Sequence, residues 1–212
     1  MNLQKGLTES LAGRFELIPV HHWSYPEWRQ AFEILCGYPA QEVSYTTLLG
    51  QLQGRGNTDL VKHYLELYEG AFLFRGLSKY SGKIAKSRAS SPKILPMCPA
   101  LYTLAAGSRS FDDPEKRGHV FEAAVGMDLL RLPGTRLFYW RDGAEEVDFV
   151  LQHDDRLYAI EVKSVRRRSV SGLPVFQSRF KGVKTCLIRP DNYAAFAQSP
   201  MEFLQTMSLK SA

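Results

Sequence analysis

The chain has 212 residues, of which 44% are hydrophobic, and its formal net charge at pH 7 is +5. This length leaves room for two small domains that each bury a core. No apolar run approaches the roughly eighteen residues of a membrane helix, and the first residues lack the hydrophobic segment of a signal peptide, so we expect a cytoplasmic protein without membrane contact.

Residues 40–106 predict a winged helix. Ser44 can cap a first helix, and Asn57 or Thr58 can cap a second one, residues 59–68, whose apolar side chains recur at helical spacing. In DNA-binding winged helices the second helix enters the major groove. Here its outward face carries few cations, so packing between domains is slightly favoured over reading of DNA.

Two apolar segments, residues 72–77 and 93–97, fit the strands of the wing, with the basic segment 79–91 as its tip. The chain has no acidic residue between Glu69 and Asp112, and a second acid-free stretch follows Glu161. Such basic blocks indicate a polyanionic partner, although a solvated loop explains the wing tip equally well. The candidate nucleic-acid-binding residues are Lys83, Lys86, Arg88, Arg166, Arg167 and Arg168.

The remaining elements follow the order α-β-β-β-α-β. We predict a helix around residues 118–125, strands at 136–140, 146–151 and 157–163, an amphipathic segment at 173–180 and a last strand at 184–188.

Three of these elements carry charged residues within apolar sequence. Alternation along a strand places Glu161 and Lys163 on the same face, about 7 Å apart. If the two preceding strand segments pair through a turn at 153–156, Asp148 lies beside Glu161, and Glu122 faces inward from the helix. Carboxylate oxygens are the ligands that Mg²⁺ (or Mn²⁺) prefers, and a nearby lysine can hold a phosphate.

Two structural explanations compete with this metal site. Glu-x-Lys is common on solvated strand faces. The four residues could also form an internal ion-pair network in which Lys163 bridges Glu161 and Asp148. The network predicts no affinity for Mg²⁺ or Mn²⁺.

The order of elements over residues 111–200 resembles the PD-(D/E)xK nuclease superfamily. Asp148, Glu161 and Lys163 match its motif, and Glu122 matches the acid on its first helix. The strings HVFEAAVGMDLL, LFYWRDGAEEVDFVL and LYAIEVKSV are similar to the C-terminal domain of a group of prokaryotic AAA+ ATPases, domain of unknown function 4143. That resemblance implies an N-terminal ATPase, a winged helix and a nuclease-like domain.

On this basis we expect a mixed α/β (α+β) protein in three parts. Residues 1–36 resemble a remnant of the ATPase domain and its linker, residues 37–110 form a winged-helix-like domain, and residues 111–212 form a nuclease-like αβββαβ domain. The chain lacks the phosphate-binding Gly-x-x-x-x-Gly-Lys-Ser/Thr motif, so it is either a truncated product or a natural remnant, and we expect no ATPase activity from it.

Two functions remain open. The first is a metal-dependent endonuclease acting on DNA, in which Asp148, Glu161 and Glu122 bind Mg²⁺ and Lys163 stabilises the phosphate or the attacking hydroxide. The second is a non-catalytic module that keeps the fold and binds nucleic acid, an ATPase domain or another protein. The intact acidic set favours the enzyme, because clustered carboxylates without a cation cost desolvation free energy. The missing ATPase motif favours the module.

Overall fold

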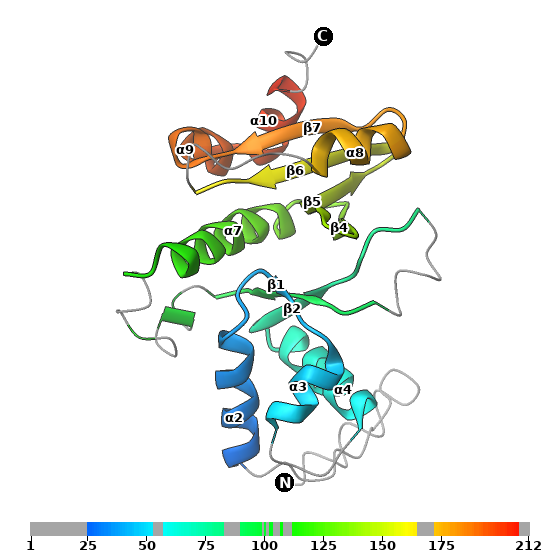
Figure 1. The fold of residues 1–212 in the computed structure, drawn as a ribbon. Coiled ribbons are helices and arrows are strands. Elements are labelled where there is room, and N and C mark those ends of the chain that lie inside the picture. The colour runs from blue at the N-terminus through cyan, green and yellow to red at the C-terminus, as the bar shows by residue number, and fades with distance from the viewer. Residues whose placement is uncertain are drawn as a thin grey trace, which may run out of the picture.

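The protein was studied as a computed structural model, which describes residues 25–52, 57–82, 90–98, 100, 102–103, 107, 112–164 and 172–207. It is a mixed α+β structure with two sheets, as predicted (Figure 1). Within the described residues, no helix is both long and apolar enough to cross a bilayer.

The N-terminal part combines helices with a small antiparallel sheet of order β1-β3-β2. Ser44 accepts a hydrogen bond from the Thr47 amide and Asn57 accepts one from the Leu60 amide, so the predicted caps of α3 and α4 are confirmed. The elements are α2 (Tyr25–Cys36), β1 (Gln41–Glu42), α3 (Tyr45–Gln51), α4 (Thr58–Gly70), β2 (Phe74–Leu77) and β3 (Lys93–Pro96). The predicted domain boundaries at 36 and 110 stay predictions.

The C-terminal part confirms the predicted order α-β-β-β-α-β. Its sheet has the order β4-β5-β6-β7, antiparallel except for the parallel pair β6 and β7. Two further helices that the sequence analysis did not predict follow the last strand. The elements are α7 (Pro114–Leu130), β4 (Thr135–Asp142), β5 (Glu145–His153), β6 (Arg156–Val162), α8 (Gly172–Arg179), β7 (Lys184–Ile188), α9 (Pro190–Gln198) and α10 (Pro200–Met207).

Helices cover both faces of this larger sheet. Phe149 and Ile160 pack in one buried cluster with residues of α7, α9 and α10. Their neighbours Val150 and Ala159 pack in a second cluster with Phe176 of α8. Burial on both faces explains why β5 and β6 are continuous apolar runs rather than alternating ones.

Helix α7 lies between the two sheets (Figure 1). A Cβ atom at Gly126 of α7 would stand 2.8 Å from both Leu95 of β3 and Phe149 of β5, so the glycine permits this close approach on both sides. The sheets also touch through the backbone, because Tyr139 of β4 exchanges hydrogen bonds with Ser78 and Tyr80 just after β2. The position of β3 is therefore tied to that of the larger sheet.

We predict that Gly172→Ala destabilises the protein by about 1–3 kcal/mol, the usual range for overpacking. A Cβ atom there would collide with the Glu146 carbonyl of β5, which is backbone and cannot rotate away. Urea unfolding measures the effect. Gly50→Ala is the matched control, since nothing lies within 4 Å of the Cβ that would be added, and its helical position should gain about 0.5–1 kcal/mol. Equal behaviour of the two variants would contradict the close packing of α8 on β5.

Candidate metal centre

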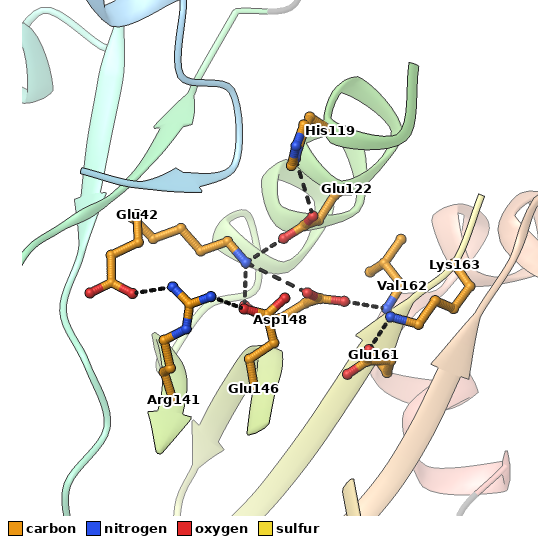
Figure 2. A network of polar contacts seen from close by, with 10 residues as sticks. Glu42, His119, Glu122, Arg141, Glu146, Asp148, Glu161, Val162 and Lys163 are labelled. Carbon is orange, nitrogen blue, oxygen red and sulfur yellow. Dashed lines mark hydrogen bonds and ion pairs between the residues drawn. The ribbon is translucent and has the colours of Figure 1, made fainter. Parts of the chain in front are cut away.

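The structure brings the four predicted site residues together at one end of the larger sheet (Figure 2). The β5–β6 hairpin forms with the predicted turn, since His153 pairs with Arg156. Asp148 on β5 and Glu161 on β6 are buried, with 5% and 3% of their surface exposed. These carboxylates lie inside the protein and not on a solvated strand face, so the solvated alternative is wrong.

Asp148 lies in a β-bulge. Phe138 pairs with Val150 and Trp140 with Val147, so two residues of β5, Asp148 and Phe149, lie opposite the single residue Tyr139. A bulge breaks the alternation of side chains and re-aims one of them. The bulge thus takes Asp148 out of the regular pairing between β4 and β5.

The carboxylate of Asp148 is fixed by the backbone of the next strand. Its Oδ2 accepts a hydrogen bond of 2.7 Å from the Val162 amide. A charged acceptor strengthens such a bond, and a backbone donor holds it in place without side-chain entropy. Asp148 is thus oriented toward the end of β6, where Glu161 and Lys163 flank Val162.

Glu161 is only half satisfied. Its Oε1 pairs with the ammonium of Lys163, whose side chain is 16% exposed. Its Oε2 is buried and has no hydrogen-bond partner. Burying a carboxylate oxygen without a partner raises the free energy of the folded state. This oxygen can therefore bind a cation or a proton.

A fifth residue, Lys93 of β3, completes the site, and the sequence analysis did not identify it. Its side chain is 9% exposed, and its ammonium pairs with Glu122, lies 3.7 Å from Asp148 Oδ1 and donates to the Asp148 carbonyl at 3.1 Å. It also lies 5.0 Å from the centre of the Phe149 ring. The only sequence signal was a cation that begins an otherwise apolar strand.

Charge–charge contacts therefore form a network, but its bridging residue differs from the predicted one. Lys163 pairs with Glu161, whereas Lys93 joins Asp148 to Glu122. His119 stands 3.8 Å from the other oxygen of Glu122. A role for Glu122 in binding metal stays a prediction, because in this structure its partner is a lysine.

Burial and neighbouring charges shift the pKa values of the whole group. Burial raises the pKa of Asp148 well above its usual value, and the nearby Glu122 carboxylate raises it further. Burial also raises the pKa of Glu161, although Lys163 opposes the shift. Burial alone would lower the pKa of Lys93 and raise that of Glu122, but their mutual attraction reverses both shifts.

The residues fit a divalent cation held by two carboxylates. Among the described residues, no group of three or more His, Cys, Asp or Glu side chains is arranged to hold a metal ion. Mg²⁺ does not require such a cage, because it commonly keeps several waters and binds through one or two carboxylates plus substrate phosphates. Asp148 and the vacant Oε2 of Glu161 supply that donor set.

A cavity of about 230 Å³ opens beside the network. Arg141 crosses it, with its guanidinium 3.1 Å from both Glu42 and Glu146. Lys93 and Glu122 also line the cavity, so water reaches the Lys93 side of the site.

The predicted nucleic-acid-binding residues lie outside the described residues; these are Lys83, Lys86, Arg88, Arg166, Arg167 and Arg168. Gln177, a polar residue of α8, is exposed and donates a hydrogen bond to the Val183 carbonyl.

A protein-family model matches part of the chain. Residues 117–202 match the model of DUF4143, a domain of unknown function. The crystal structure of protein VC1899 from Vibrio cholerae aligns with 87% of this chain and 58% of that one, at 15% identity and a TM-score of 0.29. The chain thus spans little more than half of that protein, and so low a score carries no argument about fold or function. A search of curated proteins finds no match.

We predict that Asp148→Asn stabilises the protein by about 0.5–2 kcal/mol at pH 7–8, because burial disfavours the charged form of the carboxylate that the amide replaces. The raised folded-state pKa means that the contribution of Asp148 is favourable below its unfolded pKa and is lost as the pH rises through its folded pKa. The gain should therefore shrink toward acidic pH. The amide keeps an acceptor for Val162, and the exposed Asp155→Asn serves as the control.

Urea unfolding of both variants between pH 5 and pH 8 measures the difference. If Asp148→Asn is less stable than the native chain at pH 8, the contacts of the Asp148 carboxylate with Lys93 and Val162 contribute more to the free energy of unfolding than its burial costs.

Proposed function

We propose that this chain contains a divalent-metal-dependent phosphodiesterase centre that acts on DNA. One observation carries the proposal: the buried carboxylates of Asp148 and Glu161 and the partly buried carboxylate of Glu122 face two ammonium groups, and Oε2 of Glu161 has neither a hydrogen bond nor an ion pair. With all five groups ionised, the site has one excess negative charge. A single divalent cation at Asp148 and Glu161 reverses this excess and supplies a partner for the vacant oxygen.

The resemblance to PD-(D/E)xK nucleases supports the same assignment. Asp148, Glu161 and Lys163 match the motif of that superfamily and lie within residues 117–202, which match the family model. Their elements occur in the order α7-β4-β5-β6-α8-β7, which is the order expected for such a domain. We infer from the similarity to AAA+ ATPases that an ATPase domain is the partner of this chain.

The roles follow from the contacts of each side chain. Asp148 and Glu161 would hold the ion, with the Val162 carbonyl as a further oxygen ligand. The ion supplies a Lewis acid for the phosphodiester and lowers the pKa of water. Lys163 already pairs with Glu161, and since an ammonium has three donors it can also bind a phosphate oxygen. The Val162 amide and the bulge keep Asp148 in place before the ion arrives.

A non-catalytic module is the second candidate, and Lys93 favours it. This lysine already neutralises Glu122 and Asp148 from inside the protein. If one proton on Asp148 removes the remaining excess charge, the site needs no metal, and the chain binds nucleic acid or a protein without cleaving DNA.

Titration calorimetry with Mn²⁺, followed by a nicking assay on plasmid and single-stranded DNA, separates the two candidates. We expect one ion per chain, DNA nicking that depends on the ion, and loss of both in Asp148→Asn. Asp155→Asn, in the exposed turn of the same hairpin, should behave as the native chain does.

Binding without nicking would indicate a metal-binding module that lacks its substrate or its ATPase. The absence of binding at millimolar Mn²⁺ would overturn the proposal in favour of the non-catalytic module.

A further inference from the structure

We propose that Lys93 is a built-in cation that takes the place of a second divalent ion between Glu122 and Asp148, and so limits the centre to one exchangeable ion. This inference rests on the proposed function. In this role Lys93 positions the carboxylates of Glu122 and Asp148, and its presence explains why the chain would bind one ion and not two.

The first argument is convergence. Glu122 comes from α7 and Asp148 from β5, yet both carboxylates contact the same ammonium group. Two carboxylates from different elements that meet at one cation are the donor set of a metal ion. In two-metal phosphodiesterases the ions stand about 3.5–4 Å apart and share a carboxylate. Asp148 is placed to be the shared one, since its Oδ1 faces Lys93 and its Oδ2 faces Val162, beside Glu161.

The second argument is that the Lys93 side chain is largely buried and is held from several sides. Lys93 is 7% exposed as a whole residue, and its strand is otherwise buried. Leu95 on the same strand packs against α7 at Gly126, where a Cβ would stand only 2.8 Å away. The Asp148 carbonyl also accepts a hydrogen bond from the ammonium. Lys93 is thus held in place by β3, which belongs to the small sheet and not to the β4-β5-β6-β7 sheet.

The third argument is charge. With Lys93 present, Glu122 and Asp148 have one cation between them, and the unpartnered oxygen lies on Glu161. Without Lys93, the same two carboxylates would lose the cation that they share, and a divalent ion could take its place. The lysine and a second ion are therefore alternatives for one position.

The test is the Mn²⁺ stoichiometry of the full chain, measured by calorimetry, together with electron paramagnetic resonance of bound Mn²⁺. We expect one ion with an uncoupled spectrum in the native chain and two ions with a spin-coupled spectrum in Lys93→Met. Lys93→Met/Glu122→Gln should return to one uncoupled ion, because the second position has lost a ligand.

Lys93→Met leaves two buried carboxylates unpaired, so its folding is followed by thermal unfolding at increasing Mn²⁺. Stabilisation that grows with Mn²⁺ beyond that of the native chain supports the inference, since ligands stabilise the state that binds them. The inference is overturned if Lys93→Met stays unfolded at millimolar Mn²⁺ while Lys93→Met/Glu122→Gln folds.

The outcomes also separate this inference from the proposed function. One ion in both the native chain and folded Lys93→Met overturns the role of Lys93 and leaves the metal centre intact. Binding in neither protein overturns the metal centre, and the inference with it. In a further outcome, Lys93→Met binds Mn²⁺ but the native chain and the double variant do not. This result would support Lys93 as the cation between Glu122 and Asp148, and it would overturn the proposed function of the native chain.

Discussion

The structure of this site depends on two buried carboxylates, Asp148 and Glu161, and a partly buried one, Glu122, which have only two lysines among them. Lys93 offsets part of the cost of burial, because its ammonium lies against both Glu122 of α7 and Asp148 of β5. Removing charges from water costs several kcal/mol per ion, so such a group persists only where good contacts or a ligand offset the cost. The contact also joins the two sheets, since β3 belongs to the small sheet and β5 to the large one. The ion pairs of Lys93 therefore lie at the place where the two sheets are joined.

The backbone of β5 and β6 sets the position of the Asp148 side chain. The bulge in β5 re-aims Asp148, and the Val162 amide holds its carboxylate at 2.7 Å. Helices on both faces of the sheet exclude water from the strands, which is why the pKa of Asp148 is raised by burial first and by Glu122 second. Shifted pKa values of this kind occur at functional sites and also in structural ion-pair networks, and both kinds of arrangement were proposed from the sequence.

Much of this arrangement could be predicted from sequence because it depends on local rules. Alternation placed Glu161 and Lys163 on one face, and a short turn between two apolar runs placed Asp148 beside them.

The bulge could not be predicted, since it depends on pairing with β4. Lys93 could not be predicted either, because it reaches Asp148 across 55 positions of the chain and a lysine is rarely buried. Glu122 was expected to face inward, but its partner comes from a different sheet. Helices α9 and α10 were not predicted; they lie beyond the last strand, outside the pattern of elements on which the predicted fold rests.

Crystals grown with Mn²⁺ and measured at the manganese absorption edge would test the central claim most directly. The account predicts one anomalous peak bonded to the carboxylates of Asp148 and Glu161, with the Lys93 ammonium still against Glu122. The absence of a peak beside Glu161, or a peak between Glu122 and Asp148 with Lys93 displaced, would contradict it.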